Sequence, residues 1–135
     1  MAGGGRVSIA MLCRIVDIDA RTYYDWRKRG LISRFSETKS LGEKEAAELA
    51  VVALLNKELR RPSDFDLVCR KLRGKLGERL LEGEVTVVCH LADSGAELCH
   101  TDADVGRAAS HGREVRAIRA DPEIRRVLAA LEGRK

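Results

Sequence analysis

The most regular pattern of apolar and polar positions lies near the start of the chain, between residues 7 and 32. Apolar residues recur there at the spacing of one face of a helix, at Ile9, Leu12, Cys13 and Val16. Ser8 precedes them, and its hydroxyl can accept a hydrogen bond from a free backbone N–H of the first turn. Asp17 and Asp19 then break the pattern. We therefore expect a short helix followed by a turn.

A second short helix is predicted from about Ala20 to Arg29, capped at its start by Asp19 and ended by Gly30. In a helical projection, Tyr23 and Trp26 point toward the first helix. The opposite face carries the side chains of Arg21, Asp25 and Lys28, flanked by Tyr24 and Arg29. Such a pair predicts a helix-turn-helix whose second helix enters the major groove of DNA. The alternative is a helical hairpin with an ordinary solvated basic face.

This stretch resembles the N-terminal helix-turn-helix of the MerR family of transcriptional regulators, which continues from a turn into T-[IL]-R-[YF]-[YW]-E-[RK]-x-G-L-[LI]. Residues that match in register are Thr22, Trp26, Lys28, Gly30, Leu31 and Ile32, with Tyr23 and Asp25 as approximate matches. Tyr24 replaces the family's Arg, Arg27 replaces its Glu, and Asp17 replaces the usual turn glycine. The resemblance implies a winged helix-turn-helix, double-stranded DNA as a partner, and a homodimer on an inverted repeat.

Positive charge is concentrated in the same part of the chain. Residues 1–36 contain seven Lys or Arg and three Asp or Glu, so their balance of +4 equals the formal net charge of the whole chain. A basic surface on a helix-turn-helix indicates a polyanionic partner. We expect the DNA contacts to come from Arg14, Arg21, Thr22, Tyr24, Asp25, Lys28, Arg29, Arg34 and Lys39. Among these, Arg14 and Arg34 would hold phosphates.

Residues 33–42 occupy the position of the family's wing, a small hairpin, but lack its Gly-Tyr-Arg signature. The next segment, residues 43–60, predicts a helix with apolar residues at Ala46, Leu49, Val52, Ala53 and Leu59. Pro62 ends this helix, and a fourth helix is predicted to run to about Leu81, with Ser63 to Asp66 as a capping box. Residues 1–82 are therefore expected to form a four-helix DNA-binding domain.

At Gly83 the pattern changes to that of short strands. We predict a hairpin of residues 84–91 and 96–100, a loop over 101–113, and a further short strand over 114–118. Asp121 and Pro122 then open a last helix with apolar residues at Ile124, Val127, Leu128 and Leu131. The expected fold class is α+β, mainly α, with residues 83–135 as a module for dimerisation or partner binding. The periodicity leaves open whether the last helix covers its own core or a second subunit.

The β module also resembles, in architecture, MerR-like proteins with a DUF433-type tail, some of them antitoxin-like. That second resemblance implies an alternative function, an antitoxin-type or other interaction protein that binds a partner protein through its C-terminal region.

Four cysteines in a chain without a recognisable signal peptide indicate reduced thiols. A two-residue turn at Ser94 and Gly95 would pair Cys89 with His100 and His90 with Cys99. Each face would then present one Cys and one His, whereas a structural zinc ion needs four ligands. A site would need His111 and Asp102 or a second subunit, and the spacing matches no standard zinc pattern. We therefore predict no metal or other cofactor. If a metal did bind, the candidate ligands would be Cys89, His90, Cys99 and His100.

Motifs for catalysis are not found, because the sequence contains no phosphate-binding loop, nucleophile elbow or HExxH. Cys89 and His90 are adjacent, so on a strand they face opposite ways and form no dyad. We therefore expect a non-enzymatic protein. No apolar run reaches about 18 residues, so a cytoplasmic location without membrane contact is expected.

Overall fold

The computed structural model describes residues 7–32, 40–72, 78–81, 83–90, 95–110 and 114–132. The elements in these residues are, in order, β1 (Val7–Ser8), α1 (Ile9–Val16), α2 (Ala20–Lys28), β2 (Ser40–Leu41), α3 (Glu43–Glu58), α4 (Pro62–Leu72), the 3-10 helix η1 (Glu78–Leu81), β3 (Thr86–His90), β4 (Gly95–Cys99), α5 (Asp102–Ala109), β5 (Val115–Arg119) and α6 (Asp121–Glu132). The expected class, α+β and mainly helical, is confirmed.

The first two helices form through the local signals that the sequence carries. The Ser8 hydroxyl accepts a hydrogen bond from the Met11 N–H at 3.1 Å, and an Asp19 carboxylate oxygen accepts one from the Arg21 N–H at 2.8 Å. Asp17 takes the left-handed conformation with φ 63°, and Gly30 does so after α2 with φ 76°. The two predicted helices and their caps are therefore confirmed.

The expected wing lies largely outside the described residues, and so do Arg34 and Lys39. Of residues 33–42, the structure describes β2 and Gly42. Strand β2 pairs antiparallel with β1, with Val7 opposite Leu41. This short ladder ties the chain that enters α3 to the start of α1.

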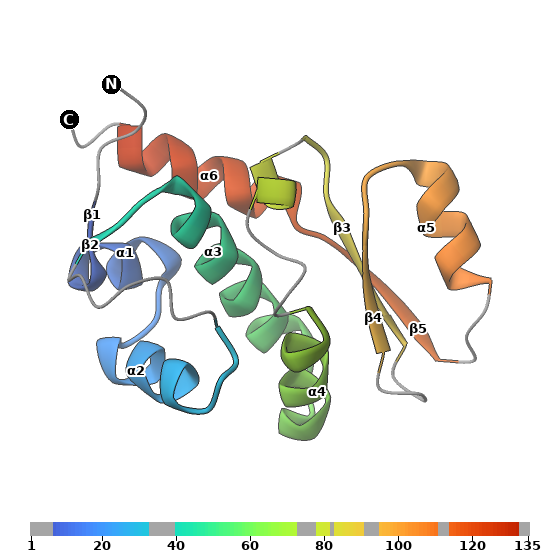
Figure 1. The fold of residues 1–135 in the computed structure, drawn as a ribbon, viewed down its shortest axis with the longest axis horizontal. Coiled ribbons are helices and arrows are strands. Elements are labelled where there is room, and N and C mark those ends of the chain that lie inside the picture. Colours follow the sequence, from blue (N-terminus) through green and yellow to red (C-terminus); the bar gives the residue numbers. More distant parts are fainter. Residues whose placement is uncertain are drawn as a thin grey trace.

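Helix α3 occupies the centre of the molecule, between α1 and α2 on one side and the second sheet on the other (Figure 1). The sequence predicted one apolar stripe, but every residue from Ala46 to Ala53 is buried, including Glu48 at 1% exposure. The reason is that neighbours surround the helix, since it contacts α1, α4, η1 and α6. The predicted stripe was thus too narrow.

Helix α4 differs from its prediction at both ends. It begins at Pro62, so Ser63 lies inside the helix and does not serve as the expected cap. It ends at Leu72 instead of near Leu81, and residues 78–81 form η1. Residues 73–77 lie outside the described part of the chain.

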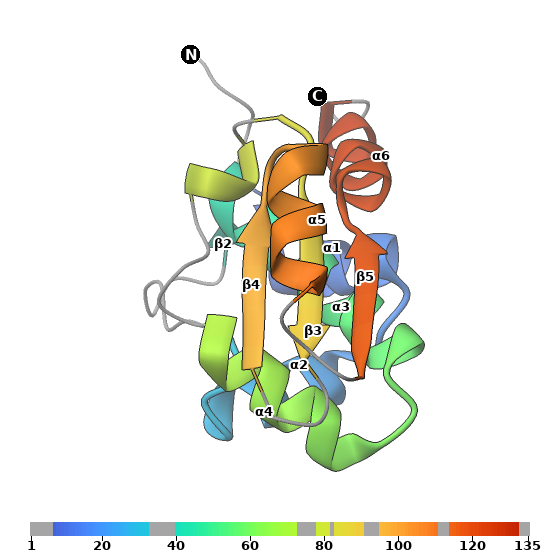
Figure 2. The same ribbon diagram turned by 90° about the vertical axis from the view of Figure 1, so that its right-hand side faces the viewer.

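The second sheet has three antiparallel strands in the order β4-β3-β5. One face carries Val87, Cys89, Ala96 and Ile118 into the main core. The other face packs Val88 and Cys99 against Ala108 of α5. Figure 2 shows α5 lying over this outer face. The sheet is therefore covered on both sides.

The loop expected at residues 101–113 is wrong, because α5 occupies most of it. The Thr101 hydroxyl caps α5 by accepting a hydrogen bond from the Asp104 N–H at 3.1 Å. Gly106 disfavours a helix in isolation, which argued against one. Packing of Val105 and Ala108 on the sheet compensates, as tertiary contacts do for most short helices.

Helix α6 packs along α3 and α1 of its own chain, which answers the question that its periodicity left open. Ile124, Val127 and Leu131 are buried in the same apolar cluster as α1 and α2. This cluster extends across the boundary that was expected between residues 82 and 83. In the described part of the chain, no helix has the length and apolar character needed to span a membrane.

Candidate nucleic-acid interface

The outward face of α2 carries a row of exposed side chains. Arg21, Tyr24, Asp25 and Lys28 are all exposed and follow one another at helical spacing. Thr22 is half-buried at the side of this row. Tyr24 is 50% exposed, and its ring stands edge-on to the buried Tyr23 ring, with 5.2 Å between ring centroids. The row therefore presents two cationic groups, a phenol and a carboxylate to solvent on one face of α2.

The inward face of α2 fixes the helix to the core. Tyr23 and Trp26 are 4% and 3% exposed, as the helical projection predicted. The Trp26 ring packs on Phe65 of α4, with centroids 5.5 Å apart. Leu31 and Ile32, which follow α2, are buried as well. Substitutions on the outward face of α2 should therefore leave the stability of the protein nearly unchanged, whereas substitutions of Tyr23 or Trp26 should lower it.

Arg29 at the end of α2 forms ion pairs within the protein. Its Nη2 lies 2.6 Å from both carboxylate oxygens of Asp66 in α4, and its Nη1 lies 3.2 Å from Asp25 Oδ2. The hydrogen bond from Arg29 to Asp66 is the main cause that raises the pKa of the guanidinium. Asp66 was not expected to take part, because its place near the start of a helix suggested a cap. In the free protein, Arg29 thus anchors α2 to α4.

The expected phosphate contact Arg14 is exposed in the last turn of α1, just before the turn that leads into α2. The backbone of that helix is held by a residue that the sequence did not single out. Arg126 of α6 donates from Nη2 to the Ile15 carbonyl oxygen at 3.0 Å and pairs with Glu123. Helix α2 is thus held by α4, and α1 is held by α6.

The four metal candidates are not brought together. The predicted strand register was wrong, because Cys89 pairs with Ala96 and His90 with Gly95, while Cys99 lies opposite Thr86 at the other end of the ladder. Cys89 lies on the sheet face that packs on the helices. The observed register places the small Ala96 beside it there, whereas the predicted register would have placed the larger His100 in that position. Ser94 and His111 lie outside the described residues.

The surroundings of these residues are those of structural side chains. Burial raises the pKa of the Cys89 thiol to about 11. His90 Nε2 lies 2.9 Å from Glu97 Oε2, and His100 Nδ1 lies 3.1 Å from the Glu84 carbonyl oxygen. Among the described residues, no group of three or more His, Cys, Asp or Glu is placed to hold a metal ion.

Comparisons of the chain with protein-family models, with curated proteins and with solved structures give no match. What the geometry offers is a short helix, held by two others, that carries exposed Arg21, Tyr24 and Lys28 in one row. Such a surface can donate hydrogen bonds to base edges and to phosphate oxygens.

Proposed function

We propose that this protein is a sequence-specific, double-stranded DNA-binding transcriptional regulator of MerR-like type, with α2 in the major groove. The observation that carries the proposal is the division of α2 into a buried face and an exposed row of Arg21, Tyr24 and Lys28. A helix in the major groove needs a rigid support and side chains that reach base edges. The caps at Ser8 and Asp19 and the contacts from α4 and α6 supply that support.

Different side chains would serve different parts of the DNA. Arg21 is suited to a guanine edge, because a guanidinium can donate two parallel hydrogen bonds to O6 and N7. Lys28, near the end of α2, and Arg14, in the last turn of α1, are suited to phosphates. Asp25 lies in the same row but pairs with Arg29, so we assign both residues to positioning α2.

The proposal includes a homodimer on an inverted repeat, which the MerR resemblance implies. Helix α6 is occupied by its own core, so the dimer contact would come from another surface, such as the β module. Light scattering tests this part separately. A monomer at high micromolar concentration would contradict the symmetric site.

The test of the proposal begins with selection of bound fragments from genomic DNA by the purified protein. Titrations against the selected fragment and a random duplex then compare Arg21→Ala and Lys28→Ala with two controls. Arg107→Ala removes an exposed guanidinium from α5, at the other end of the molecule, and Lys57→Ala removes an exposed ammonium from α3 (Figure 1). Both controls should bind DNA as the parent protein does.

Arg21→Ala should cost about 1–3 kcal/mol on the selected fragment and relax the choice of base at one position. Lys28→Ala should weaken binding to both duplexes alike and reduce the salt slope by about one. A parent affinity that does not fall with rising salt would contradict the proposal. So would unchanged affinity in both variants while their melting temperatures stay unchanged.

A further inference from the structure

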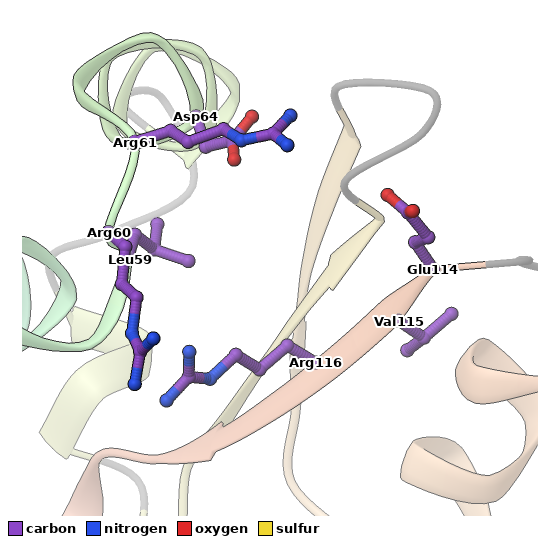
Figure 3. Close-up of a pocket in the computed structure, with 7 residues that line it drawn as sticks. All are labelled: Leu59, Arg60, Arg61, Asp64, Glu114, Val115 and Arg116. Atoms are coloured by element: carbon purple, nitrogen blue, oxygen red, sulfur yellow. The ribbon is translucent and has the colours of Figure 1, made fainter.

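A cavity of about 520 Å³ opens where the corner between α3 and α4 faces the start of β5. Figure 3 shows the side chains that line it, Leu59, Arg60, Arg61, Asp64, Glu114, Val115 and Arg116. Sites for small molecules typically measure about 300–1,000 Å³ and combine apolar walls with a few converging polar groups. The cavity has this size, but most of its lining residues are charged, which favours an ionic ligand. It shares no residue with the proposed DNA contacts.

Two guanidinium groups from distant parts of the chain point toward one another across this cavity. Arg60 follows α3, Arg116 lies on β5, and the ends of their side chains converge in Figure 3. Arg116 donates from Nη2 to Glu58 Oε1 at 2.9 Å. Among the described residues, no carboxylate lies within ion-pair distance of Arg60. In the described part of the chain, Glu58 is therefore the one carboxylate that pairs with either guanidinium, and it pairs with Arg116.

The other charges of the cavity leave this pair of cations available. Asp64 lies in the first turn of α4, where a carboxylate complements the helix N-terminus. Glu114 and Arg61 lie away from the converging groups (Figure 3). Each guanidinium has five N–H donors, and the bond from Arg116 to Glu58 uses a single donor. An oxyanion between Arg60 and Arg116 would accept from both and relieve their repulsion.

We propose that this cavity binds a small organic anion whose carboxylate or phosphate group lies between Arg60 and Arg116. Leu59, which lines the cavity next to Arg60, would contact the body of the ligand, whereas the Val115 side chain points toward α5 (Figure 3). An inorganic ion alone would leave most of the cavity to water. The proposal goes beyond DNA binding and does not depend on it.

The experiment is a nitrogen-15 NMR titration of the full chain with phenyl phosphate and with benzoate, and benzamide as the neutral control. We expect shift changes at the amides of Arg60, Arg61 and Arg116 with at least one of the two anions and none with benzamide. The anion that acts decides between a phosphate and a carboxylate ligand. Arg60→Gln should weaken binding by at least about tenfold, because it removes a charged hydrogen-bond donor.

Arg107→Gln on α5 is the matched control, since it removes an exposed guanidinium elsewhere, and it should bind the anion as the parent does. Arg116→Lys is the second variant, which keeps the charge but loses the planar fork and should also weaken binding. Native peak dispersion in each spectrum shows that the variant is folded. The proposal is overturned if neither anion shifts these amides at millimolar concentration, if benzamide shifts them equally, or if Arg60→Gln binds as tightly as the parent. Shifts at Arg60 with duplex DNA but with neither small anion would overturn it too.

Discussion

Removing Asp66 distinguishes two roles for Arg29, the proposed contact to DNA and an anchor for α2. In the free protein, Arg29 Nη2 lies 2.6 Å from both oxygens of Asp66. If Arg29 instead contacts phosphate in the complex, Asp66 competes with the DNA. Asp66→Ala would then strengthen binding, while Arg29→Ala would weaken it. If Arg29 anchors α2, both variants weaken binding.

The size of the effect follows from the geometry of the pair. The side chains of Arg29 and Asp66 are 38% and 28% exposed, so solvent screens part of their attraction. Exposed pairs contribute about 0.2–1 kcal/mol, and contacts to both carboxylate oxygens place this pair at the upper end of that range. We expect a coupling free energy of about 1 kcal/mol, which corresponds to about 4 °C in Tm for a chain of this length.

A double-mutant cycle measures this coupling directly. Urea denaturation of the parent, Arg29→Ala, Asp66→Ala and the double variant gives the free energies of unfolding. Titrations of the same four proteins with DNA should show about fivefold weaker binding in each single variant. The double variant should bind no more weakly than Arg29→Ala, because the contact between Arg29 and Asp66 is lost in all three variants and the pair with Asp25 is already lost in Arg29→Ala.

The loss of a negative charge by itself favours binding to DNA, so a charge control is needed. Asp64→Ala removes the same charge from the same helix, and Asp64 makes no contact to Arg29 in the described structure. Its DNA affinity should stay the same or rise slightly. Stronger DNA binding by Asp66→Ala than by Asp64→Ala would refute the anchoring role, and so would additive losses in the double variant.

Three further outcomes are expected. Trp26→Ala should lower the free energy of unfolding by about 3–5 kcal/mol, because the buried indole packs on Phe65. Arg21→Ala should change the free energy of unfolding by less than about 0.5 kcal/mol, because Arg21 is exposed. Urea denaturation measures both values. Val127→Asp should unfold the chain and not merely separate a dimer, because Val127 is fully buried in its own chain; a folded monomer in circular dichroism and light scattering would contradict this. The Cys69 and Cys89 thiols should resist iodoacetamide in the native protein at neutral pH, as mass spectrometry can check. Because burial raises their pKa values from 9.0 to about 12 and about 11, the unfolded chain loses these protons first, so urea denaturation should show stability falling as pH rises above 9.0.

The sequence sufficed where the signals were local. Ser8, Asp17, Asp19 and Gly30 act within a few residues of their own position, so the start and end of α1 and α2 could be predicted. The inward direction of Trp26 also followed, because a helix of known period has a defined face. The proposed DNA contacts Arg21 and Lys28 are exposed for the same reason.

The sequence did not suffice where distant segments meet. The middle of α3, residues 46–53, is buried on every face because α6 returns from the end of the chain to cover it, and the apolar spacing within α3 could not predict that contact. The strand register depended on which residues face the helices, and α5 depended on a sheet to pack on. The pair of Arg29 and Asp66 joins residues 37 positions apart in the chain, and the cavity joins Arg60 to Arg116. Such contacts require the folded arrangement.

Helix α4 connects the two proposed sites. Arg61, just before α4, and Asp64, in its first turn, line the cavity, and Asp66, two residues further on, pairs with Arg29 at the end of α2. A ligand in the cavity can change DNA affinity only if it binds two arrangements of the protein with different affinity. Two such arrangements would be one with the Arg29–Asp66 pair formed and one with it broken, which would change how α2 is held. An anion that changes DNA binding in the parent but not in Asp66→Ala would therefore identify α4 as the link, whereas an equal change in both would exclude it.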